Sequence, residues 1–138
     1  EDGGLFIFGR LNLMSTSKEL KAFHSAIKTC MQIDPYMAIS RIDAFLTYAN
    51  DPEVQTIADL QDTLRRTTGL AASSVSRNVS FWTETIYKHR DGSRPEGAGF
   101  IQLIADPADY RRRMILMTAK GEQFTDKITE AIKNGLEK

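Results

Sequence analysis

The sequence predicts an α+β fold that is mostly helical, and three observations support this prediction. Apolar residues recur at helical spacing in four stretches between residues 17 and 87, and again after residue 118. Two short apolar runs, 100–104 and 113–117, flank a turn signal and predict a β-hairpin. The 138 residues, 41% hydrophobic and 26% charged, suit one globular domain (1–138).

The first fifty residues are expected to be helical from Ser17 onward. Residues 5–14 are largely apolar and fit either a strand or the first turns of a helix. Ser17 is a candidate N-cap for a helix with an apolar face made of Leu20, Phe23, Ile27 and Met31. Asp34 is expected to cap a second helix that starts at Pro35 and ends near residue 50.

Two further helices are expected to be joined by a tight turn. Thr56 and Asp59 form a loose capping box at the start of the third helix. Gly69 can supply the positive φ that ends this helix. The fourth helix is expected to run from Ala72 to Tyr87.

The C-terminal half is expected to contain a loop, the hairpin and a last helix. Residues 88–99 are rich in Gly, Pro and charge, and predict a loop. Residues 106–109 (Asp-Pro-Ala-Asp) predict the turn between the two strands. Thr118 is expected to cap the last helix, in which Gly135 is expected to fray.

Helix, turn, helix and hairpin is the order of elements in a winged helix-turn-helix, whose second helix enters the major groove of DNA. The fourth helix divides into two faces: Val75, Val79 and Trp82 should pack inward, and polar residues lie opposite. The candidate DNA-binding residues of this helix are Ser73, Ser74, Ser76, Arg77 and Ser80. Small hydroxyls allow close approach to DNA, and Arg77 can bind a guanine or a phosphate. An ordinary amphipathic surface helix is the alternative.

Residues 106–121 resemble the wing signature of the MarR family of bacterial regulators. That signature is an Asp-Pro, an Asp, an Arg, an apolar strand and Leu-Thr-x-x-Gly at the start of a helix. The positions that match are Asp106, Pro107, Asp109, Arg111, Thr118 and Gly121, and Met117 replaces the usual Leu. Residues 69–77 are similar to the family's turn and recognition-helix start. The resemblance covers residues 57–132.

The residue types of the wing suit DNA. Arg111 at a hairpin tip can enter a minor groove, where narrow A·T tracts concentrate negative potential. Asp109 can hold that guanidinium in one orientation through a charge-assisted pair. Arg112 and Arg113 can add phosphate contacts. The alternative for this arginine run is a solvated strand edge.

The chain departs from the MarR pattern at three places. Arg65 stands where the bracing helix usually has a small residue, and Asn78 replaces a usual apolar residue of the recognition helix. The connection 87–99 is longer than usual. It fits a disordered loop, a third wing strand with an insert, or an additional DNA contact.

The charge distribution agrees with a DNA-binding middle segment. The whole chain has 18 basic and 18 acidic residues. Residues 65–121 contain ten Lys or Arg and five Asp or Glu, whereas the remainder contains eight and thirteen. A basic middle between acidic flanks is expected if only that middle meets phosphates.

Other classes of protein find little support in the sequence. No nucleophile and base can be paired, so no catalytic residue is expected. His24 and His89 are far apart and one cysteine supplies no metal-ligand spacing, so no metal site is expected, and no cofactor is expected either. His89-Arg90-Asp91 imitates a kinase catalytic loop, but the other kinase motifs are missing. No apolar run is long enough to cross a membrane, and the N-terminus has no basic secretory start. A single cysteine, Cys30, fits a reducing cytoplasm, and is expected to be a buried, inert thiol rather than an oxidant sensor.

The MarR resemblance implies a homodimer in which residues 1–50 and 118–138 form the dimerisation helices and residues 56–117 bind double-stranded DNA. Two recognition helices would then meet half-sites about one DNA turn apart. The expected function is sequence-specific transcriptional regulation, most simply repression, with room for a small-molecule effector. Two alternatives stay open: a winged-helix protein-interaction module, and a replication or partition factor of a phage or plasmid.

Overall fold

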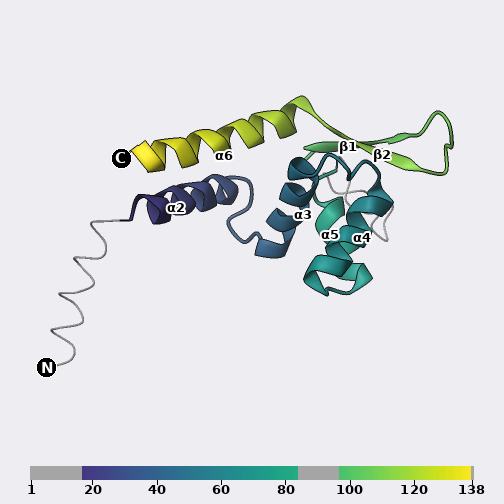
Figure 1. The fold of residues 1–138 in the computed structure, drawn as a ribbon, viewed down its shortest axis with the longest axis horizontal. Helices are drawn as coiled ribbons and strands as arrows, with labels where there is room; N and C mark the ends of the chain where they lie inside the picture. Colours follow the sequence, from purple (N-terminus) through teal and green to yellow (C-terminus); the bar gives the residue numbers. More distant parts are fainter. Residues whose placement is uncertain (1–16, 84–96, 138) are drawn as a thin grey trace, which may run out of the picture.

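The computed structural model describes residues 17–83 and 97–137, and contains five helices and one β-hairpin in these ranges (Figure 1). The helices are α2 (Lys18–Met31), α3 (Ile39–Asn50), α4 (Ile57–Thr68), α5 (Ala72–Ser80) and α6 (Ala119–Glu137), and the strands are β1 (Ile101–Ala105) and β2 (Arg113–Met117). The mostly helical α+β fold is therefore confirmed. The apolar residues 5–14 and most of the loop 88–99 lie outside the described residues.

Helix α2 begins where the sequence predicts, but α3 does not. The Ser17 hydroxyl accepts a hydrogen bond from the Leu20 amide at 3.1 Å, which is an N-cap. The predicted start of α3 at Pro35 is wrong. The Asp34 carboxylate accepts from the Tyr36 amide at 2.9 Å, so it closes a local turn instead of capping a helix. Helix α3 starts only at Ile39.

Both ends of α4 follow the predicted chemistry. The Thr56 hydroxyl accepts from the Asp59 amide, and the Asp59 carboxylate accepts from the Thr56 amide, each at 3.1 Å. This reciprocal pair is a complete capping box. At the other end Gly69 has φ 72°, a left-handed conformation that other residues adopt only with strain.

Helix α5 is shorter than predicted, because it ends at Ser80 rather than at Tyr87. The carbonyls of the next three residues bind the chain that leads into β1: Phe81 accepts from Ala98, Trp82 from Phe100 and Ile101, and Thr83 from Gly99. These carbonyls are the ones that a longer helix would have used for its own hydrogen bonds. Residues 84–87 lie outside the described part.

The hairpin is antiparallel and pairs Ile101 with Met117 and Ala105 with Arg113. Strand β2 spans the predicted residues, whereas β1 starts one residue later than predicted, at Ile101. On its other edge β2 meets the residues before α4, where the Ile115 amide donates to the Gln55 carbonyl at 2.9 Å. The hairpin is thereby fixed to the start of α4.

Helices α2 and α6 lie side by side, away from the bundle that α3, α4 and α5 form with the base of the hairpin (Figure 1). The Thr118 hydroxyl accepts from the Gly121 amide at 3.1 Å and so caps α6 as predicted. The expected fraying at Gly135 is wrong. Gly135 is buried against α2, so the absence of a side chain serves close packing of the two helices.

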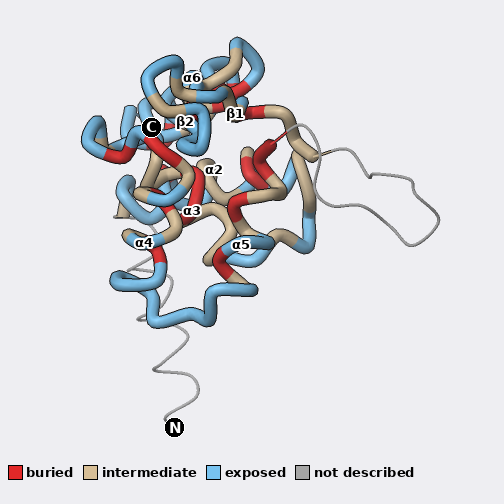
Figure 2. Tube along the Cα trace, turned by 90° about the vertical axis from the view of Figure 1, so that its right-hand side faces the viewer, coloured by how far each residue is buried: buried red, intermediate tan, exposed pale blue. Residues whose placement is uncertain are grey.

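Four aromatic side chains form the centre of the core. Phe45 of α3, Trp82, Phe100 and Phe124 of α6 are each at most 5% exposed, and their ring centroids lie 4.9–6.0 Å apart. These rings come from four separate segments, so the cluster joins α6 to the helical bundle. In Figure 2 buried stretches occur within α4, α5 and β1, whereas the turn between α4 and α5 is exposed. No helix in residues 17–83 or 97–137 is long and apolar enough to span a membrane.

Candidate nucleic-acid interface

Helix α5 is held in the body by one face and presents the other to solvent. Val75, Val79 and Trp82 are each 1% exposed, which confirms the predicted inward face. On the opposite side Ser73, Ser76 and Arg77 are exposed, and Ser74 and Ser80 are half-buried. Within residues 17–83 and 97–137, the Arg77 guanidinium reaches only the Ser74 hydroxyl, at 3.5 Å. This weak contact leaves Arg77 able to reorient toward an anion.

Hydrogen bonds at the hairpin tip fix the backbone that carries Arg111. The Asp106 amide donates to the Arg112 carbonyl at 3.0 Å, and the Arg112 amide donates to the Asp109 carbonyl at 2.9 Å. The Asp106 carboxylate accepts from the Ala108 amide at 2.9 Å. The Asp-Pro-Ala-Asp sequence thus builds a turn through the side-chain bonds that Asp favours.

Asp109 holds Arg111 at both its backbone and its side chain. One carboxylate oxygen of Asp109, Oδ1, accepts from the Arg111 amide and from Arg111 Nε, each at 3.2 Å. The Arg111 side chain nevertheless remains 86% exposed. A surface pair of this kind adds little stability, but it restricts the directions in which the guanidinium points.

The other two wing arginines differ in their surroundings. Arg112 Nε lies 4.0 Å from an Asp106 carboxylate oxygen, and its side chain is 56% exposed. Arg113 is exposed at the start of β2, opposite Ala105. All three wing arginines are therefore accessible to an anion. They belong to the hairpin, whereas Arg77 and the candidate serines belong to α5.

The Asp59 carboxylate links the start of α4 to the wing electrostatically. Burial raises its pKa, but hydrogen bonds from Thr56 and from the amides of Gln55 and Thr56 lower it, as does the positive charge of Arg112. The lowering effects are the larger in sum, so the pKa of Asp59 lies below its ordinary value. The carboxylate thus remains charged beside the base of the wing.

Asn78 and Arg65, which depart from the MarR pattern, both have a place in the structure. Asn78 Nδ2 donates to the Ser40 hydroxyl at 3.2 Å, and Asn78 Oδ1 accepts from Arg41 Nε at 3.4 Å. The amide thus joins α5 to α3. Arg65 is exposed and pairs with Asp62 on the same helix, so it does not separate α4 from its neighbours.

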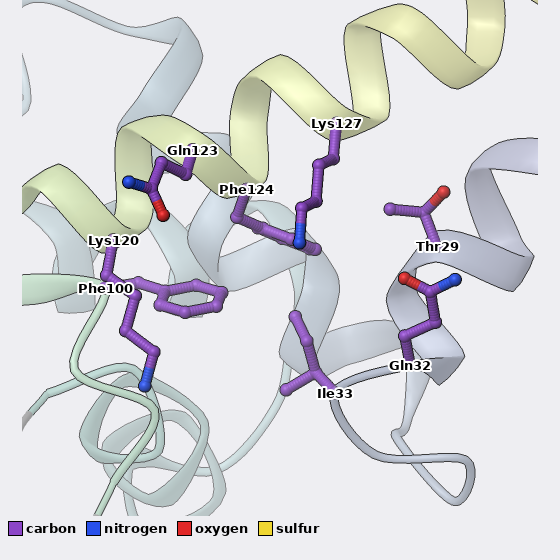
Figure 3. A pocket seen from close by; sticks show the side chains of 8 residues that line it. All are labelled: Thr29, Gln32, Ile33, Phe100, Lys120, Gln123, Phe124 and Lys127. Atoms are coloured by element: carbon purple, nitrogen blue, oxygen red, sulfur yellow. The ribbon is translucent and has the colours of Figure 1, made fainter.

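A pocket of about 230 Å³ lies between the end of α2 and the start of α6 (Figure 3). Its lining residues are Thr29, Gln32, Ile33, Phe100, Lys120, Gln123, Phe124 and Lys127. Two lysines and two aromatic rings therefore face the same space, and Lys120 Nζ is 5.8 Å from the Phe100 ring centroid. The sequence interpretation missed this site. The spacing of Lys120, Phe124 and Lys127 places them on one face of a helix, which could have indicated a site there. Phe100 and the residues of α2 reach this face only in the folded chain.

Cys30 is buried, at 4% exposure, and burial raises the pKa of its thiol. A protonated, enclosed thiol is a poor nucleophile, which agrees with the prediction that Cys30 is a buried, inert thiol. Among the described residues no three His, Cys, Asp or Glu side chains are grouped in a way that could hold a metal. The kinase-like residues 89–91 lie outside the described part.

The fold is shared with a solved structure, the crystal structure of transcriptional regulator Tm0710 from Thermotoga maritima. The two chains are 18% identical, and the match has a TM-score of 0.56 and covers 99% of this chain and 78% of that one. No protein-family model and no curated protein matches the chain. The comparison therefore shows the fold alone: a helical α+β chain with a hairpin wing, as in a transcriptional regulator.

Proposed function

We propose that the chain is a sequence-specific transcriptional regulator that binds double-stranded DNA as a homodimer and represses by covering a promoter. The single observation that carries this proposal is Arg111, which is 86% exposed at a hairpin tip and oriented by Asp109. A cation held in this way is suited to a minor groove, whose width depends on sequence.

Helix α5 supplies the second part of the proposed contact. Its buried face fixes the helix to the core, while Arg77 and the serines at 73, 74, 76 and 80 offer donors of different length on the outer face. Short hydroxyls bring the helix close to base edges, and Arg77 spans the longer distance to a guanine or phosphate. Arg112 and Arg113 add phosphate contacts beside the wing tip.

The homodimer is supported by an uncovered apolar face. On α2, Leu20, Phe23 and Met31 are 67%, 64% and 47% exposed, although they form the apolar stripe of that helix. On the neighbouring α6, Ile132 and Leu136 are 36% and 44% exposed. A second copy that packed its own α2 and α6 here would remove this surface from water. This surface agrees with the assignment of residues 1–50 and 118–138 to dimerisation.

The pocket between α2 and α6 is the place proposed for a small-molecule effector. Phe100 lines the pocket, and its amide donates at 2.8 Å to the carbonyl of Trp82, two residues after the end of α5. A ligand with a flat apolar part and a negative charge would suit the two rings and two lysines. By moving Phe100 it would change the spacing of the two recognition helices and so the affinity for DNA.

The test is binding of the purified protein to random-sequence duplex DNA at two salt concentrations, with wild type compared with Arg111→Ala. A Kd that rises steeply with salt in the wild type, and a loss of binding in the variant, support the proposal. Lys133→Ala, an exposed cation on α6, is the matched control and should bind as the wild type does. No binding of the wild type at low salt would sink the proposal and leave the protein-interaction module.

A positive result leaves the location of the natural site to be found. Selection of the preferred duplex, followed by mapping of its position, separates a promoter from a replication origin or partition site. A binding site at a replication origin or partition site would favour the alternative, a replication or partition factor of a phage or plasmid.

A further inference from the structure

Arg41 of α3 belongs to a polar contact that fixes the recognition helix to its neighbour. Its Nε donates to Asn78 Oδ1 at 3.4 Å, and Asn78 in turn donates to Ser40 at 3.2 Å. The Arg41 carbonyl accepts from the buried Trp82 Nε1 at 2.7 Å. Both the backbone and the side chain of Arg41 are therefore held by residues at the end of α5.

The guanidinium of Arg41 also stacks on an aromatic ring. Its central carbon lies 4.8 Å from the centroid of the Phe81 ring. A guanidinium that lies over a ring and is bound at one nitrogen has lost much of its conformational freedom before any ligand arrives. Anion binding at its remaining donors then costs less entropy than binding by a free surface arginine.

Helical spacing places this guanidinium beside the proposed DNA-binding face. Phe81 keeps a right-handed helical conformation and follows Arg77 by four residues, so it extends the same side of α5 by one turn. Asn78 follows Ser74 by the same interval. Arg41 touches both Phe81 and Asn78, and therefore lies on the flank of the surface that carries Arg77 and Ser74.

Among the described residues, no carboxylate lies within ion-pair distance of Arg41. The ion pairs found in residues 17–83 and 97–137 join Arg65 to Asp62, Arg111 to Asp109 and Arg112 to Asp106, and none of them includes Arg41. A half-buried cation without a counter-ion, at the edge of a helix that meets DNA, is suited to a phosphate oxygen.

We propose that Arg41 binds a backbone phosphate of the DNA next to the site read by α5, and sets the angle of that helix in the groove through Asn78. This inference rests on the proposed function, because it requires that α5 meets DNA. The sequence interpretation did not include Arg41, which lies outside the basic segment 65–121. A phosphate contact carries no base information, so Arg41 contributes affinity rather than preference among sequences.

The experiment compares Arg41→Met, Arg41→Lys and Asn78→Ala with the wild type by measuring Kd against salt concentration on one duplex. Met keeps the apolar contact with Phe81 but removes the charge. Because the proposed homodimer carries two copies of Arg41, the plot of log K against log salt should become less steep by about two for Arg41→Met. Lysine should restore the slope with weaker binding, and Asn78→Ala should weaken binding with the slope unchanged.

Two controls separate the possible outcomes. Lys133→Met on α6 removes a distant cation and should leave the slope as in the wild type, and thermal melting reports whether each variant is folded. A wild-type slope in Arg41→Met overturns the inference, even if binding is weaker, since that result means a structural role only. Failure of the wild type to bind any duplex overturns the proposed function itself, whereas equal binding by wild type and Arg41→Met overturns only the role of Arg41.

Discussion

Gly135 of α6 lies so close to Ala22 of α2 that a Cβ at residue 135 would stand 2.5 Å from the Ala22 Cα and 2.9 Å from its nitrogen. These are backbone atoms, so a side chain at residue 135 could be accommodated only if one helix moved. The contact holds the two terminal helices together within one chain, and the proposed dimer would use their exposed apolar side chains instead.

Gly135→Ala is therefore expected to destabilise the protein. Alanine improves helix propensity by about 1 kcal/mol, but overpacking of a close helix contact typically costs about 1–3 kcal/mol. We expect the overpacking to be larger, so that the free energy of unfolding falls, as measured by denaturant titration. Asn134→Ala, at the exposed neighbouring position, is the control and should be neutral or slightly stabilising. A Gly135→Ala variant as stable as this control would contradict the close contact.

Removal of the Asp59 carboxylate should lower the free energy of unfolding most at neutral pH. The pKa of Asp59 is lower in the folded state than its ordinary value of 3.8, so its ionised form stabilises the fold. That contribution is complete above pH 3.8, and it is lost as the pH falls through the folded-state pKa. The difference in unfolding free energy between wild type and Asp59→Asn should therefore begin to shrink below about pH 4 and level off below the folded-state pKa, where both proteins carry a neutral side chain at residue 59.

The control for this pH series is Asp126→Asn, which removes an exposed carboxylate of α6. Its difference from wild type should stay small at every pH tested. A difference for Asp59→Asn that grows as the pH falls would show that the carboxylate does not stabilise α4.

Loss of Asp109 should weaken DNA binding less than loss of Arg111. Asp109→Ala keeps the cation but frees it, because the side-chain contact at 3.2 Å is removed. The affinity should fall by about 1 kcal/mol, or roughly fivefold in Kd, with the salt slope unchanged. Arg111→Ala should weaken binding more and should also lower the slope by about two, since both wings of the proposed dimer lose a cation. Wild-type affinity in Asp109→Ala would show that the pair does not orient the wing arginine.

Charged substitutions on α2 should separate the proposed dimer. Leu20→Glu and Phe23→Glu put carboxylates on side chains that are 67% and 64% exposed in one chain. They should barely change the fold of a single chain but should be strongly unfavourable in an apolar interface. Light scattering coupled to size exclusion should report a dimer for the wild type and a monomer for the double variant. Glu19→Gln on the same helix is the control, and a monomeric wild type would contradict the dimer.

The local structure could be predicted from the sequence because neighbouring residues determine it. Ser17, Thr56 and Thr118 each bind an amide three residues away, so their capping roles depend on local spacing alone. The positive φ of Gly69 likewise follows from the lack of a Cβ. Strand β2 is bounded by a turn and a cap, and both are written in the sequence.

The predictions from sequence were wrong where segments far apart in the chain bind the same backbone groups or pack against each other. Helix α5 ends at Ser80 because the carbonyls of residues 81–83 bind residues 98–101 instead of continuing the helix. Gly135 is a packing residue because α2, more than a hundred residues earlier in the chain, lies against it. The spacing of apolar residues along a helix reveals neither residues 98–101 as the partner of residues 81–83 nor α2 as the partner of Gly135.

The candidate site divides in the same way. The wing could be predicted without a structure, since Asp109 and Arg111 are two residues apart and their contact needs only a turn. By contrast, Arg41 lies beside α5, and Phe100 shares a pocket with Lys120 and Lys127, only because the folded chain brings these segments together. Local spacing fixes a backbone conformation, whereas a surface assembled from several elements exists only after the aromatic core has brought them together.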